Sequence, residues 1–192
     1  MKYKIGVFGS NAEELSAKLI KKAKQIGREL ADHKVVIITG GSSGLPYQAA
    51  HEAAKKGIDA WGYSPVNDIK NQKRFAPNDD ISIYKKLIFV PKNFLFSSNQ
   101  DVSKKYRNVI STANCDAGII VSGRWGTLNE FTNLYDMGKI IGVLTNTGGI
   151  ADELPKLSKK ISKKSKARII FSNSPRELVE KVIKELNGRK NK

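Results

Sequence analysis

Three short segments of the sequence combine glycine with serine or threonine in a way that suits anion binding. Each follows an apolar run and precedes a segment with helical periodicity. Glycine has no Cβ, so the backbone N–H groups of such a turn, and of the helix start beside it, can approach a phosphate closely. The segments are Gly9-Ser10-Asn11, Gly40-Gly41-Ser42-Ser43-Gly44 and Ser122-Gly123-Arg124-Trp125-Gly126-Thr127. They predict a phosphate site, although any one of them also fits a plain tight turn.

Other kinds of site find less support in the sequence. None of the three segments is a Walker A loop, because no lysine followed by serine or threonine comes after the glycines, and none is a complete G-x-G-x-x-G fingerprint. ATP hydrolysis and hydride transfer are therefore disfavoured. His33 and His51 have no cysteine or histidine neighbours at ligand spacing, so we expect no metal site. We also expect no resident cofactor.

Seven short runs rich in β-branched residues must provide the framework for these loops. Most are continuous apolar runs, which is typical of strands covered on both faces. Alternation of such runs with helical patterns predicts an α/β fold: one Rossmann-like domain over residues 1–192, with a mostly parallel sheet of about seven strands and helices on both faces. Ligands of such sheets bind beyond the carboxyl ends of the strands. The expected strands are Lys4–Phe8, Val35–Thr39, Ile58–Tyr63, Leu87–Val90, Ala117–Val121, Ile140–Leu144 and Arg168–Phe171.

Helical spacing and capping signals predict where the first and last helices lie. An apolar stripe with three- and four-residue spacing runs from Leu15 to Leu30, and Asn11 followed by Glu14 predicts the start of that helix. Near the carboxyl end, Ser174-Pro175 followed by Glu177 predicts another helix start, and Gly188 its end. By contrast, the segment 64–86 shows no periodicity and predicts a long irregular connection.

Two of the glycine segments resemble the paired motifs of the Lonely Guy (LOG) family, long mislabelled lysine decarboxylases. Gly40-Gly41-Ser42-Ser43-Gly44-Leu45 is similar to G-G-G-x-x-G-[LV]-M, and the segment from Ser122 to Glu130 is similar to P-G-G-x-G-T-x-x-E. The resemblance covers about residues 4 to 145. The stretch Tyr106-Arg107-Asn108-Val109-Ile110, followed by Asp116-Ala117, is closest to the branch that includes molybdenum-cofactor carrier proteins.

The resemblance implies a function and a set of residues. Catalytic members hydrolyse the N-glycosidic bond of nucleoside 5′-monophosphates, which releases the free base and ribose 5-phosphate. Lysine decarboxylation is not expected. The resemblance places the family's arginine on Arg107 and its glutamate on Glu130. The expected phosphate- or nucleotide-binding residues are Gly9, Ser10, Gly40, Gly41, Ser42, Gly44, Gly123, Arg124, Gly126 and Thr127.

Several alternatives remain open at this point. Ser122 and Arg124 stand where the family has proline and its second glycine, and arginine would be strained there if the position needs a positive φ. Thr127-Leu128-Asn129-Glu130 also reads as a capping box, and Arg107 could be a plain surface residue. The second candidate function is a non-catalytic carrier or sensor of a phosphorylated cofactor such as molybdopterin.

Charge and composition restrict the partners. The chain carries 34 Lys plus Arg and 18 Asp plus Glu, a net charge of +16. Residues 151–192 contain 13 basic and 5 acidic residues, so half of the excess lies there. No aromatic residues alternate with these lysines, so the sequence favours a solvated lysine-rich helix. A nucleic-acid-binding surface is the alternative interpretation.

Further features of the sequence predict the cellular compartment and the oligomeric state of the protein. Cys115 is the only cysteine, and no apolar stretch reaches the roughly 18 residues of a membrane span. The first residues, Met1 to Phe8, lack the long apolar region and the cleavage site that are typical of a signal peptide. We therefore expect a cytoplasmic protein without membrane contact. The family resemblance favours a homodimer. Trp61 and Trp125 are expected to be packing residues, although Trp125, inside the third segment, could instead stack on a base or pterin ring.

Overall fold

Seven β-strands form one parallel sheet in the order β4-β3-β2-β1-β5-β6-β7. The computed structural model describes residues 2–11, 14–161 and 163–190. Each expected strand is present, which confirms the predicted α/β Rossmann-like fold. The strands are β1 (Tyr3–Gly9), β2 (Val35–Thr39), β3 (Asp59–Tyr63), β4 (Tyr84–Ile88), β5 (Ala117–Val121), β6 (Ile140–Leu144) and β7 (Arg168–Ser172).

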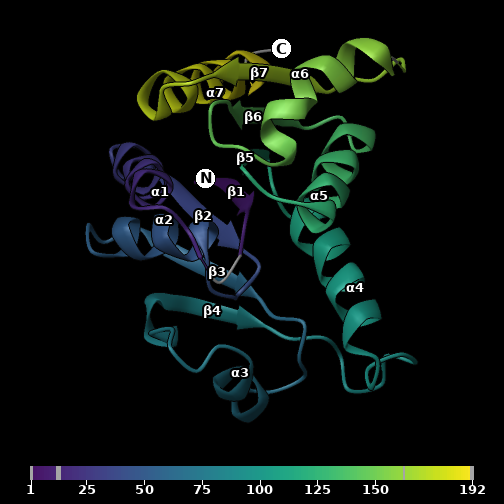
Figure 1. Cartoon of the computed structure of the whole chain (residues 1–192). Helices are drawn as coiled ribbons and strands as arrows, with labels where there is room; N and C mark the ends of the chain where they lie inside the picture. The colour runs from purple at the N-terminus through teal and green to yellow at the C-terminus, as the bar shows by residue number, and fades with distance from the viewer. Residues whose placement is uncertain (1, 12–13, 162, 191–192) are drawn as a thin grey trace.

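Helices cover both faces of the sheet (Figure 1). Successive residues of a strand point to opposite faces, so Val7 packs into the hydrophobic cluster of one face and Phe8 into that of the other. The first cluster contains residues of α1, α2 and α7, and the second contains residues of α5 and α6. The helices are α1 (Ala17–Ala31), α2 (Leu45–Ala54), α3 (Ile69–Phe75), α4 (Gln100–Ala113), α5 (Trp125–Asp136), α6 (Ile150–Lys160) and α7 (Pro175–Lys190).

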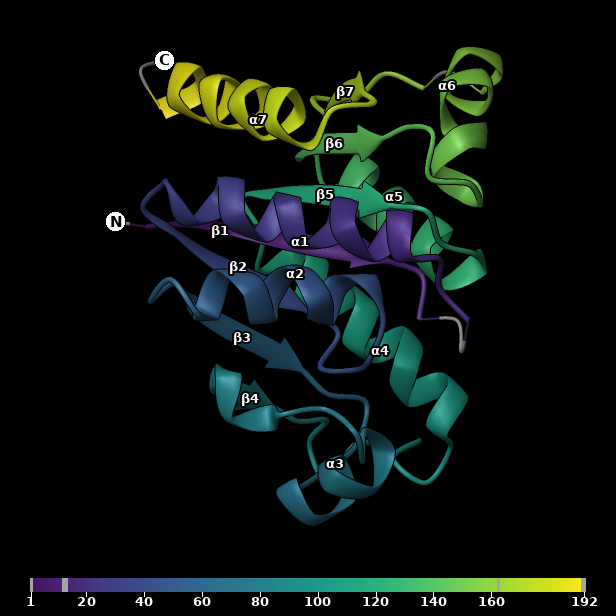
Figure 2. The ribbon, with the colours of Figure 1, turned by 60° about the vertical axis from the view of Figure 1, so that its left-hand side comes forward.

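The direction in which strands are added changes at β1. The chain proceeds outward from β1 through β2 and β3 to β4, and it then returns to place β5 on the other side of β1. Figure 2 shows β1 and β5 next to each other near the centre of the sheet. The loops after these two strands turn to opposite faces, which leaves a crevice between them. The fold therefore brings together the loops that begin at Gly9 and at Ser122.

Two predicted helix boundaries are wrong. The first helix does not start at Asn11 and Glu14: α1 begins at Ala17, and Ser16 caps it by accepting a hydrogen bond from Leu19 N. The last helix does not end at Gly188 but continues to Lys190. Arg189 stabilises this last turn because its guanidinium donates hydrogen bonds to the carbonyl oxygens of Gly138 and Lys166.

The connection predicted to be irregular contains regular structure. Helix α3 lies within it, capped by Asp68, and β4 already begins at Tyr84. The expected strand at Leu87–Val90 was placed too late, because the edge strand β4 has two exposed lysines and no continuous apolar run. Tyr84 fixes its start: the buried hydroxyl of Tyr84 lies 3.0 Å from Thr39 Oγ1. Among the described residues, no helix combines the length and apolar character that crossing a membrane requires.

Candidate functional site

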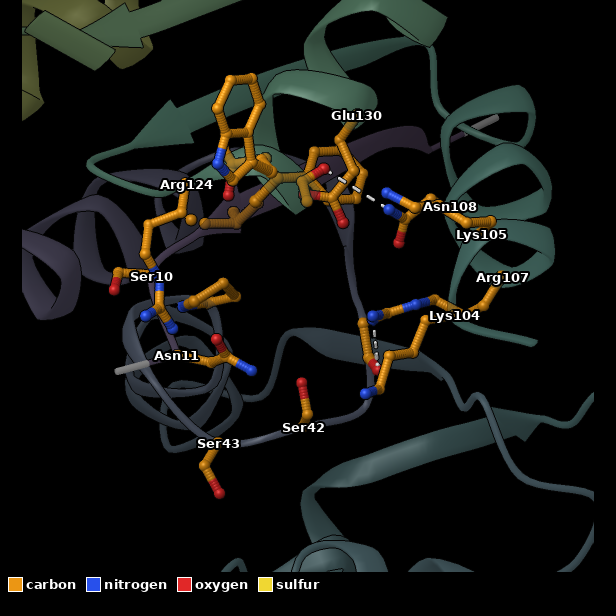
Figure 3. A pocket seen from close by; sticks show the side chains of 18 of the residues that line it. Ser10, Asn11, Ser42, Ser43, Lys104, Lys105, Arg107, Asn108, Arg124 and Glu130 are labelled. Carbon is orange, nitrogen blue, oxygen red and sulfur yellow. Dashed lines mark hydrogen bonds between the residues drawn. The ribbon is translucent and has the colours of Figure 1, made fainter. Parts of the chain in front are cut away.

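A cavity of about 550 Å³ opens at the carboxyl ends of β1 and β2, between these strands and the helices α4 and α5 (Figure 3). Most of the residues expected at a site line it: Gly9, Ser10, Gly40, Ser42, Arg107, Arg124, Gly126, Thr127 and Glu130. Gly41, Gly44 and Gly123 are not part of its lining. The fold thus brings into one cavity expected site residues that are up to 121 positions apart in the sequence, from Gly9 to Glu130.

The first turn of α5 borders this cavity with backbone amides for which no acceptor is found among the described residues. The first hydrogen bond of the helix runs from Leu128 N to Arg124 O, and the Arg124 side chain does not cap the turn. The N–H groups of Trp125, Gly126 and Thr127 are therefore among those that a helix leaves without an intrahelical acceptor. Together with the helix dipole, they form a place for an anion.

The start of α2 is a poorer anion site, although its loop is glycine-rich. Leu45 N donates to Ser10 O, and Pro46 has no N–H group to offer. Gly44 has a φ of 103°, and a Cβ at this position would overlap the backbone of Ser10 and Asn11. This glycine therefore allows the first and second loops to pack against each other, and Gly41 is held by hydrogen bonds to Thr39 and Gln72.

Arg107 enters the cavity from α4 and is held by the second loop. Its Nη1 donates a 2.7 Å hydrogen bond to the carbonyl oxygen of Gly40, while its buried Nε has no partner among the described residues. Burial lowers the pKa of the guanidinium, and the neighbouring Glu130 opposes this shift. A surface arginine would show neither feature, so that alternative is wrong.

Glu130 lies on the wall of the cavity, with only 7% of its surface exposed. Burial raises the pKa of its carboxyl to about 7, although the charges of Arg107 and Lys105 act to lower it. The capping-box alternative is wrong, because α5 begins at Trp125 with Arg124 as its N-cap and Glu130 is already in its second turn. The side chain thus has no role at the helix start, and Figure 3 shows it directed toward α4 and the cavity.

Helix α4 supplies a row of polar lining residues that the sequence analysis did not select. Asp101, Lys104, Lys105 and Asn108 recur at three- and four-residue spacing, so they share one face of the helix. Asn108 is almost fully buried, and its Nδ2 donates to Gly126 O at 3.4 Å and to Asn129 Oδ1 at 3.1 Å. The spacing of these four residues could have indicated a polar helix face, but no glycine motif marks that face as part of a site. Asn11 and Ser43 add polar groups to the rim on the side of α2, where the apolar ring of Pro46 also lines the cavity.

The two departures from the family motif have different structural consequences. Arg124 has a φ of −129°, so this position does not need glycine and the expected strain is absent. Ser122, in contrast, has a φ of 55°, and its N–H donates a 2.9 Å hydrogen bond to Thr147 Oγ1. Proline could neither adopt this positive φ nor donate this hydrogen bond, because its ring fixes φ and it has no N–H group.

The two tryptophans differ in their surroundings. Trp125 is 83% exposed at the cavity, so the expectation that it is a packing residue is wrong. Trp61, in contrast, is partly buried under Lys4 and Lys86.

A comparison with models of protein families shows to which family the chain belongs. The model of the SLOG cluster4 family matches residues 2–179. The chain belongs to the SLOG cluster4 family. SLOG proteins include LOG-like and DprA-like members, so the predicted relationship to the LOG family is confirmed. No curated protein sequence matches the chain.

Solved structures share the SLOG fold over nearly the whole chain. TM1055 superposes with a TM-score of 0.76 at 19% identity and covers 96% of this chain and 99% of its own. The molybdenum cofactor binding protein of Rippkaea orientalis gives 0.69 at 22% identity, covering 97% and 98%. DNA processing protein A of Helicobacter pylori, which has a single-stranded DNA binding mode, gives 0.69 at 20% identity, covering 95% and 81%. At these identities the similarity shows the fold alone.

Proposed function

We propose that the cavity binds a nucleoside 5′-monophosphate and that Glu130 and Arg107 promote hydrolysis of its N-glycosidic bond. The observation that carries this proposal is the nearly buried Glu130 carboxyl in the cavity wall, with a pKa of about 7 and Arg107 near it. A carboxyl group that titrates near neutral pH is suited to accept or donate a proton during catalysis. The resemblance to LOG enzymes supports the same two residues.

The phosphate is assigned to the first turn of α5. The free amides there provide directional hydrogen bonds, and Arg124 lies beside them on the cavity lining. Lys104 and Lys105 face the cavity from α4. Because these positive groups all line one cavity, they favour a dianionic phosphate over a neutral ligand.

In the proposed hydrolysis, Glu130 stabilises positive charge on the sugar and orients the attacking water. When the bond between C1′ and the base nitrogen breaks, its electron pair leaves with the base and positive charge develops on C1′ and the ring oxygen. A nearby carboxylate stabilises this charge and orients the water whose oxygen then bonds to C1′. The proton of that water finally resides on the base. Arg107 can donate a hydrogen bond to the sugar or to the leaving base.

The position of Glu130 also favours an enzyme over a store for anions. A carboxylate close to a phosphate site repels the phosphate, and the cost is greatest where burial excludes water. A protein that only holds an anionic ligand gains nothing from this repulsion. An enzyme gains stabilisation of the positive transition state, which outweighs weaker ground-state binding.

A carrier of a phosphorylated cofactor is the second candidate, and two observations favour it. Trp125 presents an exposed ring beside Arg124 at the cavity, which suits a large aromatic ligand such as a pterin. A molybdenum cofactor binding protein also shares the fold. In this reading the α5 amides and Arg124 would hold the phosphate of the cofactor, and no bond would be broken.

Base release separates the two candidates. Wild type, Glu130→Gln and Arg107→Ala are incubated with AMP, GMP, CMP and UMP, and free base is measured by chromatography beside calorimetric binding and a thermal melt. For an enzyme, Glu130→Gln lowers turnover by orders of magnitude while monophosphate binding is kept or improved. If the folded, ligand-binding wild type releases no base, the enzymatic proposal is wrong and the carrier function takes its place.

A further inference from the structure

Asn108 has an acceptor atom that the described protein leaves without a partner. Its side chain is 3% exposed and belongs to the lining of the cavity, and its Oδ1 is buried with no hydrogen bond. Leaving a buried acceptor unpaired costs more than an average hydrogen bond contributes. A group from outside the described chain is thus expected to donate to it.

The orientation of Asn108 is fixed by its other atom. Both hydrogens of Nδ2 have acceptors, the carbonyl oxygen of Gly126 and Oδ1 of Asn129. The reversed amide would place its oxygen against the Gly126 carbonyl, which offers no hydrogen, so this orientation is disfavoured. Asn108 therefore links α4 to the first turn of α5, and Oδ1 is turned away from that link (Figure 3).

A donor without a partner lies on the preceding residue of the same helix. Arg107 Nε is also buried and finds no acceptor in the part of the chain that the structure describes, and Arg107 lines the same cavity. Consecutive residues thus offer one free donor and one free acceptor. A hydroxyl group both donates and accepts a hydrogen bond, so it is the simplest chemical group that suits such a pair.

We propose that Asn108 Oδ1 accepts a hydrogen bond from a ribose hydroxyl of the ligand, so that Asn108 favours a nucleotide that carries this hydroxyl over the deoxy analogue that lacks it. The inference rests on the proposed function, because it takes the phosphate to lie at the start of α5. From there the sugar, which is the next part of a nucleoside monophosphate, reaches the side of the cavity formed by α4. The identity of the base has no part in this selection.

The test compares sugars under otherwise equal conditions. Calorimetry measures the affinity of wild type for AMP, 2′-deoxy-AMP and 3′-deoxy-AMP, with ribose 5-phosphate as a probe without base. We expect one of the deoxy compounds to bind about 3- to 10-fold more weakly than AMP, which corresponds to one neutral hydrogen bond. Asn108→Ala should remove this difference by weakening AMP binding and leaving that of the deoxy compound nearly unchanged. Asn108→Ser serves as a second variant if the alanine variant does not fold.

Asn133→Ala is the matched control. Asn133 also carries a buried amide nitrogen that has no acceptor within the described ranges, but it lies outside the cavity lining. Its replacement should therefore keep the wild-type ratio between AMP and the deoxy compounds. The inference is wrong if wild type does not discriminate, if Asn108→Ala keeps the discrimination, or if none of the ribose probes binds. Discrimination without release of base supports the inference and contradicts the proposed hydrolysis, whereas release of base without discrimination does the reverse.

Discussion

The guanidinium of Arg107 occupies the space that a side chain at residue 40 would need. Nη1 donates to the Gly40 carbonyl oxygen, and a Cβ built on Gly40 would overlap that nitrogen. We predict that Gly40→Ala displaces Arg107. Loss of a hydrogen bond to a charged group should lower the free energy of unfolding by roughly 2 kcal/mol. Turnover, if the protein is a hydrolase, should fall at least ~10-fold. Denaturant unfolding and base release measure the two effects.

Gly188→Ala is the control for this prediction. Gly188 lies inside α7, where no atom is within 4 Å of an added Cβ. Alanine should raise the stability there by about 0.5–1 kcal/mol, because it favours the helix, with no effect on the site. Equal and small effects of the two substitutions would show that Arg107 is not held by Gly40.

Ser122 can be tested against the family motif. Replacement by proline, which restores the residue of the family, should destabilise the protein by at least ~3 kcal/mol, because proline cannot adopt a φ of 55° and has no N–H for Thr147. Ser122→Gly keeps the N–H and suits the positive φ, so it should be neutral or slightly stabilising. Chemical denaturation of both variants checks this. A proline variant as stable as wild type would mean that the loop readily adopts the conformation of the family.

The framework of the fold was predictable from the sequence, because buried parallel strands have continuous apolar runs. The exception, β4, shows the limit: it is an edge strand whose Lys85 and Lys86 are exposed, so it lacks that run. Helix starts were harder to predict. Asn11 with Glu14 and Thr127 with Glu130 both have the composition of a capping box, yet neither pair starts a helix. Composition alone does not determine which of several polar residues acts as the cap.

The candidate site was predictable where glycine-rich segments follow strands and less so where a helix face forms the wall. Gly9, Gly40 and Gly126 line the cavity as expected. Asn108 and Lys104 were not selected, because each is an ordinary polar residue of an amphipathic helix until α4 is placed beside α5. Sequence also could not separate glycines that face the cavity from Gly44, which packs two loops together.

The lysines of the carboxyl-terminal region and those of the cavity should behave differently. Lys159 and Lys160 are exposed near the end of α6, outside the cavity lining, so replacing both with glutamine should change the affinity for AMP less than ~2-fold. The same change at Lys104 and Lys105 should weaken AMP binding about 10-fold and reduce its salt dependence. Calorimetry at two salt concentrations decides this. If the first pair instead abolished salt-sensitive binding to single-stranded DNA or RNA, the nucleic-acid alternative would gain support.

Three exposed apolar residues of α4 and of the segment before it lead to a prediction about assembly. Leu95 is 84% exposed, Phe96 50% and Val109 41%, and large apolar side chains left exposed on a folded protein are candidates for a contact surface. We predict a homodimer through this face, the commonest assembly symmetry being twofold. Phe96→Asp with Val109→Asp should produce monomers in sedimentation analysis, whereas Ile161→Asp, on the exposed end of α6, should not. A wild type that is monomeric at micromolar concentration would contradict this.

Glu130 should make the stability of the protein decrease as the pH rises. Its pKa is about 7 in the folded protein and 4.5 for an unburied glutamate side chain, so the folded state binds its proton more tightly. The contribution of Glu130 is therefore most favourable below pH 4.5 and becomes less so as the pH rises toward and past 7, by up to about 3 kcal/mol. Glu130→Gln cannot ionise and avoids this loss. Relative to wild type, it should be more stable at pH 8 than at pH 5 in urea unfolding. Glu177→Gln should differ from wild type by the same amount at pH 5 and pH 8, because hydrogen bonds from Lys181 and Ser172 lower the pKa of Glu177. Its charged form therefore stabilises the fold equally at both pH values, and this contribution is lost only as the pH falls below 4.5. Parallel pH profiles for the two variants would show that Glu130 is not held in a desolvated, proton-binding environment.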